Sequence, residues 1–244
     1  MSTNETNRSK VEVIDLLFDD SPDFHWWGQK AKNYSIQRPV LDWIAEHTEP
    51  DHLTIETGCG YTTVLLGAIG CEHHAVAPVP QEFENIKRWS GEKGIDISKT
   101  NFHVTGSQDY LPKCGLSGID LALIDGAHAF PFPFIDWHYI AEAMKVGGVM
   151  LVDDTQLRTV EILREFMLTE PERWELVTEL GKTAVFRKIS EEVYTKTSDW
   201  TAQPYCTEYK SPRFQKNWKA KLRAVPVVGD LASKVNRAIK GGGA

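Results

Sequence analysis

Apolar runs alternate with amphipathic stretches between residues 53 and 168, and this alternation predicts strands and helices in turn. Val, Ile and Leu stand next to one another in the apolar runs, which is typical of strands buried on both faces of a parallel sheet. The predicted strands cover residues 53–57, 73–77, 101–105, 119–125 and 148–154. The predicted helices cover residues 62–70, 81–93, 134–145 and 159–168.

An antiparallel hairpin is predicted after the last of these helices, with strands at residues 174–180 and 183–189 and a turn at Gly181-Lys182. Successive β–α units followed by a hairpin predict a doubly wound, Rossmann-like α/β fold with a seven-stranded, mostly parallel sheet. The predicted domain boundaries are 1–34 for an N-terminal tail and lid, 35–189 for the α/β domain and 190–244 for a basic C-terminal extension.

The segment before the sheet has a polar start, an aromatic patch and a predicted helix. Residues 1–10 are polar and we expect them to be disordered, whereas a helix is predicted over residues 35–47. The patch at residues 24–27 (FHWW) has two interpretations. One, taken over residues 11–50, is a helical flap that packs on the sheet edge. The other is a lid over a substrate, because adjacent tryptophans on a loop are costly to expose to water.

The composition is that of a soluble globular protein, with 41% hydrophobic and 25% charged residues. No apolar run approaches the roughly 18 residues of a membrane-spanning helix, and no secretory signal is recognisable. The four cysteines are scattered without CxxC spacing, which argues against a zinc ribbon or a disulfide framework. A reducing cytoplasm is the expected location.

The net charge of −7 conceals an acidic body and a basic tail. From Lys210 onward, nine Lys or Arg face the single acid Asp230, so this segment carries +8 and residues 1–209 carry −15. An acidic body is a poor surface for nucleic acid, so we expect a small-molecule partner. Residues 230–240 have the spacing of an amphipathic helix. Two interpretations stay open for the tail: docking on its own subunit or on a second copy in a homo-oligomer, and peripheral attachment to an anionic membrane.

A glycine-containing turn follows the first predicted strand of the sheet. Glu56, Gly58 and Gly60 lie where that strand gives way to its helix, at the carboxyl edge where doubly wound sheets bind ligands. Glycines let the backbone approach a ligand there, and a helix N-terminus favours an anionic group. The spacing is not the dinucleotide form GxGxxG, because position 63 is Thr.

Three carboxylates are predicted at the same edge. Asp125 ends the fourth strand, and Asp153 and Asp154 end the fifth. Clustered carboxylates repel one another unless they are neutralised, and a hard cation such as Mg²⁺ takes carboxylate oxygens as ligands. His128 follows Asp125 closely, and an imidazole suits a general base near neutral pH.

The E-x-G-x-G turn resembles the first motif of class I S-adenosylmethionine (SAM)-dependent methyltransferases, and the resemblance extends over residues 35–189. The other matching segments are Gly106 to Pro112 after the third strand, Ile119 to His128 with its IDGxH pattern, Lys145 to Val149 at the entry to the fifth strand, and the closing hairpin. The Asp…Asp-Asp arrangement is similar to the metal triad of Mg²⁺-dependent O-methyltransferases acting on catechol-type and sugar substrates.

The resemblance implies a role for each of these residues. Glu56, Gly58, Gly60 and Asp125 belong to the cofactor site, with the glycines at the methionine end of SAM. Ser107 and Gln108 border the adenine. The metal ligands are Asp125, Asp153 and Asp154, and His128 is the general base.

The chain departs from the family pattern at the second strand. No acid stands at Ala77 or Pro78, where the family places the carboxylate that holds the ribose hydroxyls. Glu82 or Glu84 could reach round, but both are expected on a solvated helix face.

The expected function is a SAM-dependent, divalent-metal-assisted O-methyltransferase for a hydroxylated small molecule such as a sugar, a polyol or a catechol-like compound. The missing ribose acid motivates an alternative, a catalytically silent binding or scaffold protein with the same fold. A nicotinamide oxidoreductase is disfavoured by the absence of both the third glycine and the strand-two acid.

Overall fold

The computed structural model describes residues 8–27, 30–32, 36–197 and 199–207, with only the backbone described at 26–27 and 30–32. The chain divides into two compact units, Met1–Lys196 and Thr197–Ala244. The second unit contains, among its described residues, the short helices η2 (Trp200–Ala202) and α8 (Pro204–Thr207). The predicted helix at 230–240 lies outside the described residues. No helix in the described part is long and apolar enough to cross a membrane.

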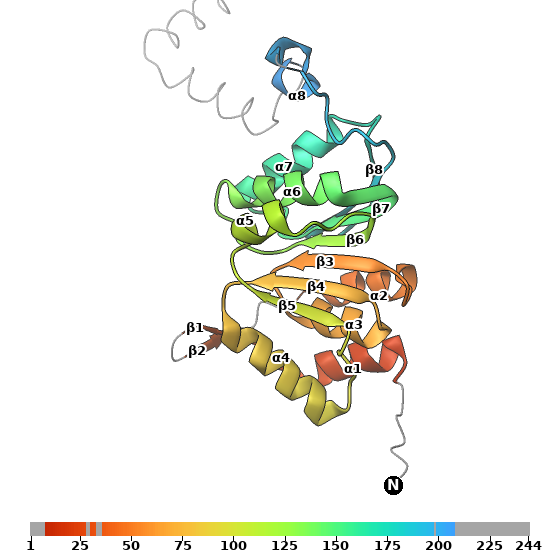
Figure 1. The fold of residues 1–244 in the computed structure, drawn as a ribbon, viewed down its shortest axis with the longest axis vertical. Coiled ribbons are helices and arrows are strands. Elements are labelled where there is room, and N and C mark those ends of the chain that lie inside the picture. The colour runs from red at the N-terminus through yellow and green to blue at the C-terminus, as the bar shows by residue number, and fades with distance from the viewer. Residues whose placement is uncertain (1–7, 28–29, 33–35, 198, 208–244) are drawn as a thin grey trace, which may run out of the picture. The chain divides into compact units, whose positions relative to one another are not determined.

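The first unit is built on a seven-stranded sheet with the order β5-β4-β3-β6-β7-β9-β8 (Figure 1). Neighbouring strands from β5 to β7 pair in parallel, whereas β9 pairs antiparallel with β7 and β8. The strands are β3 (Leu53–Thr57), β4 (Glu72–Ala77), β5 (Thr100–Val104), β6 (Ile119–Ile124), β7 (Met144–Val152), β8 (Trp174–Leu180) and β9 (Thr183–Lys188). The predicted fold class is confirmed.

Two hydrophobic clusters cover the two faces of this sheet, because successive strand residues point to opposite sides. Leu121 and Leu123 of β6 face one cluster, and Ala122 and Ile124 face the other. The helices of the first face are α1 (Lys10–Asp20), α2 (Arg38–His47), α3 (Tyr61–Ile69) and α4 (Pro80–Lys93). Those of the second face are α5 (Ser107–Tyr110), with the adjoining η1 (Leu111–Lys113), α6 (Phe132–Ala143) and α7 (Arg158–Leu168).

The predicted junction between α6 and β7 was wrong. Helix α6 ends at Ala143, and β7 begins at Met144 instead of position 148. Met144 pairs with Ile119, and the next pair joins Val149 to Leu121, so the intervening residues form a bulge. A Cβ atom on Gly148 would come within 2.8 Å of the Ile119 carbonyl oxygen, and this close approach explains the glycine.

The N-terminal segment packs more closely on the sheet domain than the sequence predicted. Ser9 caps α1 through a capping box with Glu12, although residues 1–10 were expected to be disordered. Ile14 and Leu17 of α1 are fully buried in the first cluster. The aromatic patch forms strand β1 (His25–Trp27), which pairs with β2 (Lys30–Lys32) in a small antiparallel hairpin. The tryptophan side chains lie outside the described residues, so the lid stays a prediction.

Candidate active site

The glycine turn lies at the point where the strand order reverses. β3 and β6 are neighbours, but their following helices, α3 and α6, cover opposite faces, which opens a crevice at the carboxyl edge. Gly58 has φ +91°, and a Cβ atom there would lie 2.5 Å from the Asp125 carbonyl oxygen. The Asp125 N–H donates to the Thr57 carbonyl at 3.1 Å. The turn and the Asp125 strand end therefore touch.

Glu56 lies beneath this turn and is only 1% exposed. Its carboxylate accepts hydrogen bonds from the hydroxyls of Thr62 and Thr63, and His73 Nε2 lies 3.0 Å from its Oε1. Thr63 also accepts a hydrogen bond from the Gly60 N–H at 2.8 Å. These contacts hold the start of α3 in place, so Glu56 stabilises the conformation of the glycine turn.

The predicted adenine-side residues differ in exposure. Ser107 is buried, whereas Gln108 is exposed and folds over Gly106. Near Ser107 lies Asp136 of α6, fully buried and without a hydrogen-bond partner on either carboxylate oxygen. Burial raises the pKa of Asp136, an effect that the nearby Ser107 and Thr57 hydroxyls only partly offset. From the sequence, Asp136 was given no role beyond packing or a substrate contact, because a single acid in this helix does not reveal its burial.

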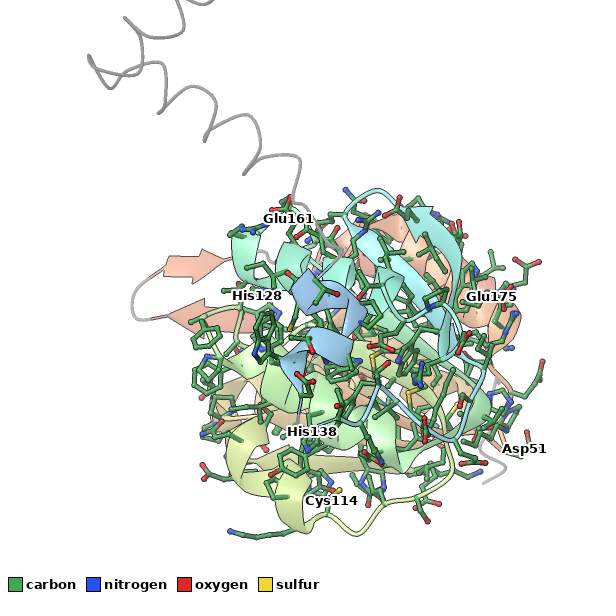
Figure 2. All side chains as sticks on the ribbon, turned by 90° about the horizontal axis from the view of Figure 1, so that it is seen from above. Asp51, Cys114, His128, His138, Glu161 and Glu175 are labelled. Carbon is green, nitrogen blue, oxygen red and sulfur yellow. The ribbon has the colours of Figure 1, made fainter. Side chains whose placement is uncertain are left out.

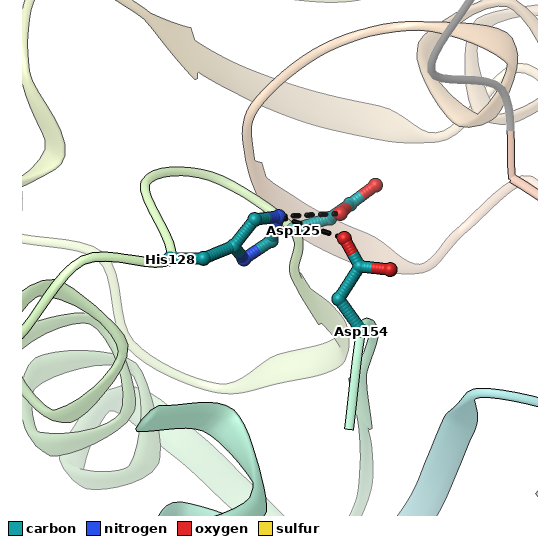
Figure 3. Close-up of side chains that lie close together, drawn as sticks. All are labelled: Asp125, His128 and Asp154. Carbon is teal, nitrogen blue, oxygen red and sulfur yellow. Dashed lines mark ion pairs between the residues drawn. The ribbon is translucent and has the colours of Figure 1, made fainter. Parts of the chain in front are cut away.

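Asp125, His128 and Asp154 converge at the same edge (Figure 3). Nε2 of His128 lies 2.9 Å from Oδ2 of Asp154 and 3.8 Å from Oδ1 of Asp125. One ligand atom from each residue lies within 4.8 Å of the others, the one such group of three among the described residues. The Thr159 hydroxyl donates to the His128 carbonyl and so anchors this loop to α7.

Asp153 does not join this group, although the sequence placed it among the metal ligands. Its carboxylate is 1% exposed, accepts a hydrogen bond from the Thr183 hydroxyl and lies 3.1 Å from Nζ of Lys182. Nζ of Lys182 also lies 2.6 Å from Oδ1 of Asp154. Lys182, from the turn between β8 and β9, is thus the cation next to the cluster, and sequence reasoning gave it no role beyond that turn.

The carboxylates of the cluster differ in their electrostatics. Removal from water, together with repulsion from Asp153 and Asp154, raises the pKa of Asp125 well above its usual range. The pKa of Asp154 is lowered by its contact with His128 and, more weakly, by Lys182. The site therefore holds one carboxylate that favours the anion and one that favours the neutral acid.

Two further positions bear on the site. Glu82 was expected on a solvated face, but it is 6% exposed and lies 3.0 Å from Nδ1 of His25, so that prediction was wrong. Glu84 is exposed, as predicted. Figure 2 shows His138 of α6 separated from His128, which leaves His128 as the histidine of the acidic cluster.

Comparisons with known proteins bear on the family and the fold of the chain. Residues 55–155 match the family model described as a methyltransferase domain. No curated protein matches the sequence significantly. Over these residues the chain is similar to a methyltransferase domain, and its fold is that of class I SAM-dependent methyltransferases. The sequence resemblance to this class is thereby confirmed.

Solved structures share the fold at low identity. The O-methyltransferase TomG from Streptomyces achromogenes, in complex with SAM, has a TM-score of 0.54 at 13% identity, covering 75% of this chain and 90% of TomG. A putative caffeoyl-CoA O-methyltransferase from Staphylococcus aureus has a TM-score of 0.56 at 10% identity, covering 75% and 93%. A putative rRNA methylase from Clostridium thermocellum has a TM-score of 0.53 at 13% identity, covering 65% and 99%. Methyltransferases with different acceptors thus share this fold, so the fold alone does not define the methyl acceptor.

Proposed function

We propose that this methyltransferase transfers the methyl group of SAM to a hydroxyl oxygen of a small molecule, assisted by a divalent cation. The observation that carries the proposal is the contact between the glycine turn and the acidic cluster. A Cβ atom on Gly58 would fill the space beside the Asp125 backbone, and the Asp125 carboxylate belongs to the group with His128 and Asp154. A cofactor at the turn and an acceptor at the cluster would be neighbours, as in-line transfer requires.

The residues at the turn fit SAM. The start of α3 offers N–H groups to the SAM carboxylate. Buried polar atoms of Thr57 and Asp136 lie near each other without close hydrogen-bond geometry, which suits a polar ligand or ordered water beside them. Ser107 and Gln108 remain the proposed adenine neighbours.

The cluster also fits a divalent cation. Asp125 and Asp154 supply carboxylate oxygens, which Mg²⁺ and Mn²⁺ both accept, and His128 stays outside the coordination shell as the base. A bound divalent ion would lower the pKa of a coordinated hydroxyl. We assign Asp153 to holding Lys182 in place, because its oxygens contact Lys182 and Thr183.

The protein's own groups would handle the proton. An alcohol is a weak nucleophile until it loses its proton, and His128 is the base at this edge. Asp154, whose Oδ2 lies 2.9 Å from Nε2, orients the imidazole. Lys182 fixes Asp154 in turn.

Polar surroundings favour a hydroxylated acceptor. A hollow of about 330 Å³ opens beside Lys182, and its other lining residues are mostly polar, among them Gln37, Thr155 and Gln156. A sugar, a polyol or a catechol-like compound offers the neighbouring hydroxyls that a metal chelates. These acceptors belong to the proposal.

Calorimetric titration with SAM and S-adenosylhomocysteine (SAH), with and without Mg²⁺ or Mn²⁺, tests the proposal. We expect SAM and SAH both to bind, and methyl transfer to a panel of hydroxylated acceptors to fall in EDTA. Full activity in EDTA would show that the methyl transfer needs no divalent cation. If neither SAM nor SAH binds, the alternative of a catalytically silent binding or scaffold protein is favoured instead.

A further inference from the structure

The end of β4 lacks the acid that nucleotide-binding sheets use to hold a ribose. In doubly wound folds, a carboxylate about 20 residues after the glycine turn accepts hydrogen bonds from the ribose hydroxyls. β4 ends at Ala77, and Pro78 follows. The first acid along the chain is Glu82, in the first turn of α4. Its side chain is 8% exposed, whereas that of Glu84 is 65% exposed.

The Glu82 carboxylate faces the glycine turn. The Cys59 thiol, within the turn, donates to its Oε2 at 3.5 Å. Nδ1 of His25, on the hairpin strand β1, lies 3.0 Å from its Oε1. The His25 ring also lies against the turn, because a Cβ atom on Gly60 would come within 3.4 Å of Nε2. One buried acid thus joins the hairpin, α4 and the turn.

The partners of Glu82 leave part of its carboxylate available to a ligand. Burial, with a contribution from Glu82, raises the pKa of the Cys59 thiol, so this neighbour stays a neutral donor. A carboxylate has about four acceptor positions, and the contacts of Glu82 with Cys59 and His25 occupy two of them. Two vicinal hydroxyls would match the remaining capacity.

We propose that Glu82 takes the place of the missing strand-two acid and accepts hydrogen bonds from the ribose hydroxyls of the cofactor, with His25 as its positioning residue. The proposal rests on SAM being the cofactor. A purely structural clamp between the hairpin and α4 is the competing role for the same contacts.

The test measures binding of SAH and of its 2′,3′-dideoxy analogue to the full-length protein and to Glu82→Gln. We expect the substitution to weaken SAH binding by about 10- to 100-fold, the range for a lost hydrogen bond to a charged group. Wild type should lose a similar factor with the analogue. Glu82→Gln should then bind SAH and the analogue almost equally, because the interaction is already absent.

Two further variants sharpen the test. His25→Ala should show a smaller loss of SAH affinity and a reduced preference for SAH over the analogue. Glu84→Gln, on the same helix but exposed, should match wild type with both ligands.

The outcomes separate the hypotheses. If Glu82→Gln keeps the full preference for SAH over the analogue, the carboxylate is only a clamp and the ribose proposal is overturned, whatever happens to the melting temperature. If wild type binds SAH well without any preference over the analogue, the ribose proposal fails and the proposed function survives. If wild type binds neither ligand, both fail together.

Discussion

Nε2 of His128 lies 2.9 Å from Oδ2 of Asp154 but 3.8 Å from Oδ1 of Asp125. This asymmetry separates the two carboxylates energetically. The imidazole and Lys182 hold Asp154 as an anion, while Asp125 is left among like charges. The two aspartates should consequently respond to neutralisation in opposite directions.

Asp154→Asn should destabilise the protein at pH 7 by about 1–2 kcal/mol, because a charge-assisted contact is lost. The pKa of Asp154 is lowered in the folded state, so its contribution is present above the unfolded pKa of about 4 and disappears as pH falls through the lower folded value. Urea unfolding at several pH values between 7 and 3 measures this. A gap between the two proteins that widens on acidification would contradict the assignment.

Asp125→Asn should stabilise the metal-free protein at pH 7. The pKa of Asp125 is raised in the folded state, so the ionised carboxylate lowers the free energy of unfolding. The wild-type free energy of unfolding should therefore rise again as the pH falls from the folded pKa towards the unfolded pKa of about 4. A gain of about 1 kcal/mol corresponds to a rise in Tm of roughly 2–4 °C. Thermal melts in EDTA provide the measurement, and adding Mn²⁺ should reverse the order because the variant lacks a ligand. A lower Tm for the variant in EDTA would show that Asp125 is not repelled.

His128→Ala should lower turnover by ~100-fold or more, the range for a lost general base. SAH affinity should change little, because the glycine turn keeps its contacts through Glu56 and Thr63. His138→Ala is the matched control, since His138 lies apart from the cluster (Figure 2). If the variant keeps its turnover, a residue other than His128 acts as the general base.

The sheet could be predicted from sequence because its strands are short apolar runs with turns between them. Gly58 and the strand-end aspartates could be placed because the carboxyl ends of parallel strands share one edge. The helix α1 was missed, although Ser9 and Glu12 carried a capping-box signal.

Within the site, the directions of the side chains could not be predicted from the sequence. Asp153 and Asp154 are neighbours in sequence, and neighbouring residues at a strand end point to opposite sides. Asp154 adopts φ +58° and turns toward His128, whereas Asp153 turns to Thr183. Lys182, on the closing hairpin, contacts Asp153 and Asp154. This is a tertiary contact, so no local sequence pattern predicts it.

Lys182→Met tests whether a lysine or a metal is the working cation of the site. Nζ of Lys182 lies 3.1 Å from Oδ2 of the buried Asp153, so its loss leaves an uncompensated charge and should lower the free energy of unfolding by about 3 kcal/mol. The same change removes a positive charge beside Asp154, so Mn²⁺ should bind more tightly and raise the Tm of the variant more than that of wild type. Lys87→Met, which removes an exposed lysine paired with Glu84, is the control and should change neither quantity. If Mn²⁺ stabilises Lys182→Met no more than wild type, and wild type is fully active in EDTA, the lysine itself neutralises the cluster and the methyl transfer needs no metal.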